Sequence, residues 1–380
     1  MTETLSELEQ AAALPLPTAD EVAGAWDLHP KKHPATREQR EAIFNRLSFG
    51  VDYTDHMAHA VYDEGKGWHS KVIEPYGPLT LDPAAAVFHY GQEIFEGLKA
   101  YRHDDGSIWS FRPGYNAARL NASARRLAIP ELPVEDFLAS IVGLVRADAD
   151  WVPSVPGSSL YLRPFIIATE PFLGVRSARR LDYLCIASPS GPYFVNGFQP
   201  ISVWVSPDYH RAGPGGTGAA KCGGNYASSL VPKLAAHEEG FDEVCFLDAA
   251  TNTNVDELGG MNVFVVYEDG SVSTPVLTGN ILEGGTRGAI LQILRDRGNV
   301  VREETIPLQS LIADIESGKV AEVFACGTAA VVTPIGRIAG EGFDVSVTGG
   351  DVTKSIYDQV TSIQLGHAPD PYNWTYQLSA

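Results

Sequence analysis

A single lysine, Lys221, lies in a glycine-rich stretch from Gly213 to Tyr226 that reads GPGGTGAAKCGGNY. Glycine lets the backbone adopt positive φ angles and approach a bound ligand closely. A P-loop, which also places a lysine beside glycines, requires glycine directly before that lysine and Ser or Thr directly after it. Here Ala220 precedes and Cys222 follows, which favours a reactive amine over a phosphate cradle. A solvated lysine in a flexible surface loop is the alternative.

The residues near Lys221 could hold a cofactor that reacts with an amine. Pyridoxal phosphate forms a Schiff base with lysine and accepts the electrons of a carbanion next to nitrogen. Its site also needs an acid at the pyridine nitrogen and a group at the ring hydroxyl. Asp256 and Glu257 are the candidate acids, although either could be a solvated turn residue. Tyr226 could reach the ring oxygen if the glycines turn the chain back.

Two turns of small residues are candidates for a phosphate site. Gly285 and Thr286 lead into a helical pattern, and free backbone N–H groups at a helix start bind anions. An ordinary N-cap at Thr286 is the alternative. The segment Cys326–Ala330 follows an expected strand and could donate N–H groups in the same way. A phosphate dianion also favours a guanidinium, for which Arg119 is one of several candidates.

Strands and helices are both expected along the chain. Turn signals between Tyr76 and Arg112 predict strands joined by hairpins. Apolar periodicity predicts helices that open at Arg112 and Val134, and two more that follow Tyr226 and Thr286. Further strands are expected at residues 160–168, 183–187, 201–205, 243–247, 262–267 and 322–325. This mixture predicts an α+β fold.

A chain of 380 residues predicts two domains. Residues 1–40, which are rich in Ala, Pro and charge, are expected to form an N-terminal arm, followed by a small N-terminal domain at 41–187. The loop 188–200 holds two Gly and three Pro and is the expected boundary. Residues 201–380 form the expected large C-terminal domain.

Composition limits the partners. The formal charge of -19 argues against nucleic acid and anionic membranes as partners. No apolar run approaches the roughly 18 residues of a membrane span, and the first ten residues do not resemble a secretory signal. The four cysteines form no C-x-x-C pair, which argues against a zinc site. We therefore expect a cytoplasmic enzyme with reduced thiols and no metal.

Five motifs in order strengthen the cofactor hypothesis. They are FEGLKAYR at 95–102, YLRP at 161–164, KCGGNY at 221–226, ELGGMN at 257–262 and GTAA at 327–330. From about Tyr76 to Thr333 the chain resembles the bacterial-type branched-chain-amino-acid aminotransferases, which are fold-type IV pyridoxal-phosphate enzymes. The resemblance implies a smaller N-terminal α/β domain, a larger C-terminal domain with a β-barrel-like core, and the cofactor between them. It also implies a homodimer in which each chain completes its neighbour's pocket.

The resemblance also implies residue roles. Lys221 would be the catalytic Schiff-base lysine, Glu257 the partner of the pyridine nitrogen, and Tyr226 the group on the ring hydroxyl. The phosphate and ring contacts would come from Arg119, Leu282, Thr328 and the backbone of Gly285 and Thr286. The substrate pocket would be lined by Tyr90, Phe95, Tyr161, Arg163 and Tyr193, with the turn at Thr328 and Ala329 holding the α-carboxylate.

The implied reaction is reversible transamination of Leu, Ile or Val with 2-oxoglutarate, which gives the branched-chain 2-oxo acid and L-glutamate. An apolar pocket favours a branched side chain by roughly 1.5–3 kcal/mol. Arg163 is the expected charge partner of the distal carboxylate of 2-oxoglutarate, with a structural ion pair as its alternative role. D-amino-acid aminotransferase and aminodeoxychorismate lyase are the alternatives within the fold type, and a non-catalytic phosphate-ligand binding protein is the alternative outside it.

Overall fold

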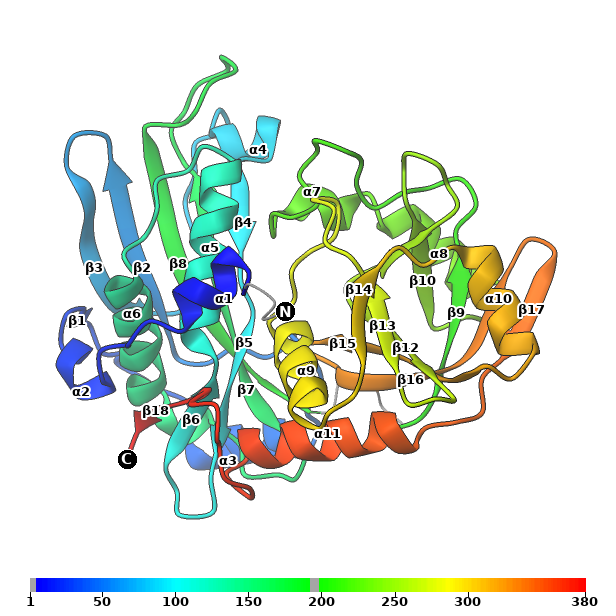
Figure 1. Ribbon diagram of the computed structural model, residues 1–380. Coiled ribbons are helices and arrows are strands. Elements are labelled where there is room, and N and C mark those ends of the chain that lie inside the picture. The colour runs from blue at the N-terminus through cyan, green and yellow to red at the C-terminus, as the bar shows by residue number, and fades with distance from the viewer. Residues whose placement is uncertain (1–4, 192–197) are drawn as a thin grey trace. The chain divides into compact units, whose positions relative to one another are not determined.

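The computed structural model describes residues 5–191 and 198–380. The chain falls into two units, one made of Met1–Tyr193 with Ser362–Ala380 and the other of Phe194–Thr361. Each unit is built on its own sheet, as the ribbon in Figure 1 shows. Within the described residues, no helix has both the length and the apolar character to span a membrane.

The sheet of the first unit has nine strands. Their order is β1-β3-β2-β8-β7-β5-β6-β18, and β4 pairs with β7 beside this path. The strands are β1 (Asp27–Leu28), β2 (His56–Asp63), β3 (Gly67–Pro75), β4 (Glu93–Phe95), β5 (Leu98–Arg102), β6 (Ile108–Phe111), β7 (Ser159–Ala168), β8 (Arg180–Ser190) and β18 (Thr375–Ser379). Every pairing in this sheet is antiparallel except β1 with β3. As in any strand, consecutive side chains point to opposite faces of the sheet.

Helices cover this first sheet. They are α1 (Glu7–Ala12), α2 (Ala19–Val22), α3 (Arg37–Phe44), α4 (Ala86–Tyr90), α5 (Pro113–Arg126), α6 (Val134–Ala147) and the 3₁₀ turn η1 (Ala149–Trp151). The expected helices at 112 and 134 are confirmed as α5 and α6. Pro113 is the first residue of α5. Proline suits this position because the first N–H groups of a helix have no partner within the helix, so the N–H that proline lacks is not missed. The apolar face of α6 packs on β2, β3 and β8.

The sheet of the second unit also has nine strands and mixes parallel with antiparallel pairs. The order is β11-β10-β9-β16-β15-β12-β13-β14, and β17 pairs with β16. The strands are β9 (Ile201–Val205), β10 (Glu243–Leu247), β11 (Val255–Leu258), β12 (Asn262–Tyr267), β13 (Val272–Pro275), β14 (Val301–Glu304), β15 (Val320–Gly327), β16 (Val331–Gly340) and β17 (Phe343–Ser346).

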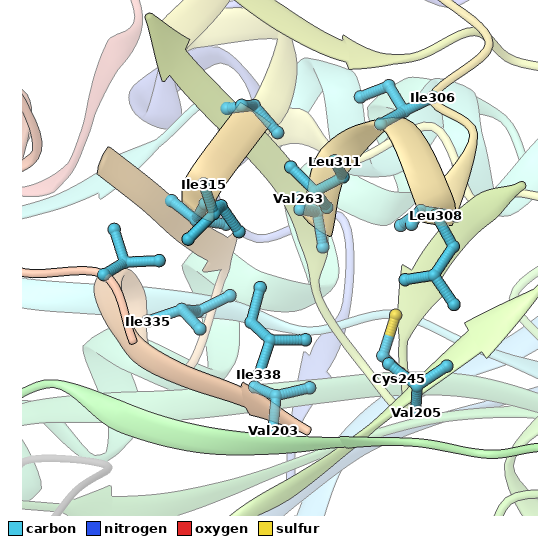
Figure 2. Packing of buried hydrophobic residues seen from close by; sticks show 14 of the residues in the cluster. Val203, Val205, Cys245, Val263, Ile306, Leu308, Leu311, Ile315, Ile335 and Ile338 are labelled. Atoms are coloured by element: carbon cyan, nitrogen blue, oxygen red, sulfur yellow. The ribbon is translucent and has the colours of Figure 1, made fainter. Parts of the chain in front are cut away.

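Helices accompany the second sheet at α7 (Gly223–Ala227), α8 (Leu230–Glu238), α9 (Gly285–Asp296) and α10 (Leu308–Glu316), and α11 (Asp351–Gln364) leads back toward the first unit along the chain. The main core lies where α10 meets this sheet (Figure 2). Leu308, Leu311 and Ile315 have the spacing of one helix face and pack with Cys245 and Val263. Burial of this cluster fixes the strand ends that carry the candidate site.

The α+β class is confirmed, and the expected strands of the second half appear as β9, β10, β12 and β15. Two features differ from the expectation. The segment from Tyr76 to Arg112 also holds the short helix α4. The last strand, β18, lies in residues 201–380 but pairs with β6 of the first sheet. The boundary within 188–200 stays a prediction, because residues 192–197 lie outside the described residues and Ser188–Ser190 complete β8.

Candidate active site

The backbone before Lys221 is folded into two successive tight turns. Gly216 N–H donates to Gly213 O at 2.9 Å, and Ala220 N–H donates to Thr217 O at 2.9 Å. Gly218 packs so closely on a neighbouring loop that an added Cβ would lie 2.1 Å from a carbonyl oxygen of that loop. Glycine at this position therefore serves a close backbone approach rather than flexibility.

Lys221 and Tyr226 meet at their polar ends. The two residues flank the start of α7, whose N-cap is Cys222, so the short helix turns the chain back on itself. The ammonium Nζ of Lys221 donates to Tyr226 Oη at 2.6 Å. An amine and a phenol thus share one location, as the five-residue spacing suggested.

Glu257 provides a buried carboxylate in the same unit. It lies on β11, is 3% exposed, and accepts from Leu282 N–H at 3.0 Å. It also forms an ion pair with Arg211, whose Nη1 lies 2.9 Å from Glu257 Oε1. Burial raises the pKa of Glu257 to about 7, while the charges of Arg211 and Lys221 oppose that rise. This acid is therefore close enough to Lys221 to respond to its charge.

The neighbouring acid, Asp256, has different surroundings. Successive residues of a strand point to opposite faces, so Asp256 and Glu257 face apart. Burial and the charge of Asp248 raise the pKa of Asp256 to about 6, and the charges that oppose this come from Arg211 and His210. Of the two candidate acids, Glu257 is the one whose pKa responds to the lysine.

Arg211 was not anticipated from the sequence. Its side chain is buried, and Nη1 donates to Gly218 O at 3.1 Å and Asn280 O at 3.0 Å as well as pairing with Glu257. One guanidinium thus joins the turn before Lys221, the loop before Leu282 and the buried acid. Its position ten residues before Lys221 gave no periodic signal, because the contacts come from three separate segments.

The start of α9 has no side-chain cap. Its N-cap is Gly284, so the alternative of an N-cap at Thr286 is wrong, and Thr286 is the second helical residue. Asn262 supports the approach to this helix by donating from Nδ2 to Leu282 O at 3.0 Å. An added Cβ on Gly284 would lie 2.2 Å from Asn262 Oδ1. Helix N-termini with such close packing offer backbone N–H groups to an anion.

The second small-residue turn, Thr328–Ala330, links β15 to β16. Gly327 pairs with Val331 across its base. Val331 has a φ of 60°, which is unusual for a β-branched residue. Strain of this kind is commonest at functional turns.

Arg119 in the first unit is held by an acid. Its Nε and Nη2 donate to the two carboxylate oxygens of Glu96 at 2.7 and 2.9 Å, and Asn116 Nδ2 donates to the same carboxylate at 2.7 Å. Arg119 and Glu96 are almost fully buried. Glu96 belongs to the FEGLKAYR motif, but its role was not inferred from it.

Tyr161 and Arg163 lie on one face of β7 in the first unit. Arg163 Nη2 donates to Tyr161 Oη at 2.9 Å, and its guanidinium carbon lies 4.7 Å from the centre of the Phe95 ring. Within the described ranges, no carboxylate lies within ion-pair distance of Arg163, and its buried Nε has no hydrogen-bond partner. The alternative role of Arg163 as a structural ion pair is therefore not supported.

Two other expected pocket residues stand apart from this group. Tyr90 ends α4, is 42% exposed, and its hydroxyl donates to Leu173 O. Tyr193 lies outside the described residues. Both stay predictions as substrate contacts.

The side chains of Lys221, Tyr226 and Glu257 in the second unit fit pyridoxal phosphate. An amine, a phenol and a buried carboxylate are the groups that the aldehyde, ring hydroxyl and ring nitrogen of this cofactor require. The uncapped start of α9 suits its phosphate. Within the same described residues, no cluster of His, Cys, Asp and Glu is suited to a metal ion.

Comparisons with known proteins agree with this chemistry. The family model for class IV amino-transferases matches residues 93–338. A branched-chain-amino-acid aminotransferase of Mycolicibacterium smegmatis is 50% identical over 91% of this chain and 96% of its own length. The crystal structure of the Escherichia coli branched-chain amino acid aminotransferase has a TM-score of 0.71 at 28% identity, covering 85% of this chain and 100% of that one.

The crystal structure of the branched-chain aminotransferase of the archaeon Thermoproteus uzoniensis, solved with norvaline, has a TM-score of 0.70 at 26% identity. It covers 84% of this chain and 99% of its own. Another branched-chain amino acid aminotransferase among the similar structures holds pyridoxamine 5'-phosphate, the amino form of the cofactor that the Lys221 site fits. The matches extend over both units. The chain belongs to the class IV aminotransferases, within the branched-chain-amino-acid aminotransferase family.

Proposed function

We propose that this enzyme reversibly transfers the amino group of L-leucine, L-isoleucine or L-valine to 2-oxoglutarate, with pyridoxal phosphate as cofactor. The products are a branched-chain 2-oxo acid and L-glutamate, formed in two half-reactions on one site. The observation that carries the proposal is the contact of Lys221 with Tyr226 beside the buried Glu257. The similar proteins are named branched-chain-amino-acid aminotransferases, which supports branched-chain amino acids as the substrates. We further propose that the enzyme is a cytoplasmic homodimer.

The residues proposed to hold the cofactor have separate roles. Lys221 would bind its aldehyde, Tyr226 its ring hydroxyl and Glu257 its ring nitrogen, with Leu282 against the ring. Its phosphate would be bound by Arg119, Thr328 and the backbone N–H groups of Gly285 and Thr286. Bound there, pyridoxal phosphate supplies an aldehyde that takes up the amino group and a ring that accepts the electron pair released at the substrate α-carbon.

Lys221 carries the proton in this proposal. With the cofactor bound, the free amine Nζ of Lys221 would act as the base that takes the proton from the substrate α-carbon, and as the acid that later returns it. Tyr226 Oη, at 2.6 Å, keeps Nζ oriented for both positions. Orientation of this kind lowers a barrier without new binding energy in the ground state.

Glu257 sets the charge at the ring nitrogen. The pKa of about 7 lets this carboxyl be ionised when Arg211 and a cationic ring nitrogen face it. Arg211 keeps the carboxylate in place through Nη1. The N–H of Leu282, which follows Glu257 in the chain, also donates to Glu257 Oε1 at 3.0 Å and helps to hold the carboxylate.

Substrate recognition is assigned to the first unit and to the Thr328–Ala329 turn. Phe95 and Tyr161, with Tyr90 and Tyr193, would enclose a branched side chain. Arg163 would bind the distal carboxylate of 2-oxoglutarate or glutamate, a role supported by the lack of a carboxylate partner among the described residues. The turn would hold the α-carboxylate through backbone N–H groups.

The purified protein, saturated with pyridoxal phosphate, tests the proposal. L-Leucine with 2-oxoglutarate should give 4-methyl-2-oxopentanoate and L-glutamate, and D-alanine should react far more slowly. A preference for D-alanine would replace the proposal with a D-amino-acid aminotransferase. A preparation that is colourless after the excess cofactor has been removed would instead favour a non-catalytic phosphate-ligand binding protein.

A further inference from the structure

Asn225 has a buried side-chain amide with three hydrogen bonds. The residue is 3% exposed. Its Nδ2 donates to Thr217 O and to Ala220 O, each at 2.8 Å, and its Oδ1 accepts from Thr217 Oγ1 at 2.8 Å. Carbonyl oxygens can only accept, so the two carbonyls fix which end of the amide carries the nitrogen.

The two carbonyls that Asn225 binds are the ends of the turn directly before Lys221. Ala220 N–H also donates to Thr217 O at 2.9 Å, so the amide spans the whole turn. Asn225 itself lies within α7, where its N–H donates to Cys222 O at 3.2 Å. The side chain therefore closes a loop that contains Lys221 and Cys222.

The next residue, Tyr226, contacts the other end of the lysine. Its Oη lies 2.6 Å from Lys221 Nζ. Adjacent residues of α7 thus hold the backbone and the amine of one lysine. The turn has further anchors in Arg211, which binds Gly218 O, and in Gly279, whose carbonyl accepts from Ala219 N–H at 3.0 Å.

Those further anchors differ from Asn225 in what they connect. Arg211 and Gly279 tie the turn to segments that precede it or lie far along the chain. Asn225 ties the turn to the helix that carries Tyr226. Loss of the amide would loosen the turn between Thr217 and Ala220 and free the lysine backbone to move relative to the phenol.

We propose that Asn225 is a positioning residue that holds the backbone of Lys221 so that its amine meets Tyr226. The inference rests on the proposed function, because it assumes that Lys221 is the reactive amine. A misplacement of about 1 Å can cost about 100-fold in rate, whereas binding of the amino acid does not involve this turn. The expected defect is therefore in kcat rather than in KM.

The main test variant is Asn225→Asp. The carboxylate keeps the shape of the amide but cannot donate to the two carbonyls. Thr217→Val is a milder test variant, because it removes only the hydroxyl that fixes Oδ1. Asn299→Asp is the matched control: its Nδ2 also donates to a backbone carbonyl, Gly270 O at 3.0 Å, but in the turn between β12 and β13 of the same unit.

Kinetics of the holoenzyme give the first readout. We expect Asn225→Asp to lower kcat for the L-leucine half-reaction about 100-fold with KM changed by less than about threefold. Thr217→Val should lower kcat about fivefold to tenfold, and Asn299→Asp should leave both constants unchanged. An unchanged kcat in Asn225→Asp, or a fall shared equally by all three variants, would overturn the proposal.

Hydrogen exchange of the full chain without cofactor gives a second readout that does not depend on activity. Amides at 219–222 should exchange at least about tenfold faster in Asn225→Asp, while amides of β10 and β15 keep the wild-type rate. Uniform acceleration would indicate general destabilisation and would contradict the proposal. If Asn225→Asp does not fold, Thr217→Val decides by the same two readouts.

The outcomes separate this inference from the proposed function. If wild-type enzyme does not transaminate L-leucine but exchange at 219–222 responds to Asn225→Asp, the proposed substrate fails and the positioning of Lys221 stands. If wild-type enzyme is active and neither readout responds, the positioning role fails and the proposed function stands.

Discussion

Replacement of Glu257 by glutamine should change how the stability of the cofactor-free protein depends on pH. The pKa of this buried carboxyl is about 7 in the folded protein, against an ordinary value of 4.5 for glutamate. A carboxyl with a raised folded pKa binds more protons in the folded than in the unfolded state between these two values. Stability is therefore lost as pH rises through that window.

The size of the effect follows from these two pKa values. Ionisation costs the folded state about 1.4 kcal/mol at pH 5.5 and about 3.3 kcal/mol at pH 8. Wild type should thus lose about 2 kcal/mol over this range that Glu257→Gln does not lose. Glutamine still accepts from Leu282 N–H, so that hydrogen bond is kept. Any constant cost of leaving Arg211 without its ion pair drops out of the comparison.

Urea unfolding of both proteins at several pH values from 5.5 to 8 measures this difference. Glu268→Gln, which changes an exposed carboxylate of the same unit, is the control and should follow the wild-type profile. Parallel profiles for wild type and Glu257→Gln would refute the reasoning, because they would show that Glu257 does not titrate in a low-dielectric site.

Three further substitutions test other parts of the account. Arg163→Gln should raise KM for 2-oxoglutarate by about 10- to 100-fold and leave the L-leucine half-reaction nearly unchanged. The control Arg125→Gln, at an exposed ion pair of the same unit, should change neither. Equal losses in both half-reactions would contradict the role assigned to Arg163. Gly218→Ala should cost about 1–3 kcal/mol in unfolding free energy and weaken cofactor binding, because its Cβ would meet a backbone carbonyl. The control Gly224→Ala has open space around the added Cβ and should be tolerated. Equal effects of the two variants would show that the close approach at Gly218 does not require glycine. Val331→Asn should stabilise the protein by about 1 kcal/mol in thermal unfolding, because asparagine adopts a φ of 60° more readily than valine. A destabilised variant would show that the backbone at Val331 is not strained.

The local part of the site was predictable from the sequence. The five-residue separation of Lys221 and Tyr226 needed only a short helical turn between them, and α7 provides it. The mixture of strand and helix signals predicted the α+β fold. The sequence itself left Asp256 and Glu257 open as the acid, and only the family resemblance favoured Glu257.

The long-range part was not predictable. Arg211 acquires its role from contacts with Gly218, Asn280 and Glu257, and no pattern near Arg211 indicates such partners. The pairing of β18 with β6 joins segments more than 260 residues apart. Pairings of that kind depend on tertiary packing, which local propensity does not encode.

Glu96 and Asn225 could be predicted only in part: both lie in motifs that the sequence shows, but their contacts do not follow from the sequence. Glu96 orients Arg119 through two hydrogen bonds, and Asn225 spans a turn with one amide. A buried side chain that binds backbone carbonyls leaves no periodic trace in a sequence, so its function appears only when the chain is folded.

The identity of the reactive lysine is tested most directly by trapping. Purified protein saturated with pyridoxal phosphate is reduced with borohydride, digested, and analysed by mass spectrometry for the lysine that carries the phosphopyridoxyl group. We expect one labelled residue, Lys221. Burial lowers the pKa of Lys99 to about 8, which makes that amine the strongest competitor in the described part of the chain. A label on Lys99, with Lys221 unmodified, would contradict the central claim.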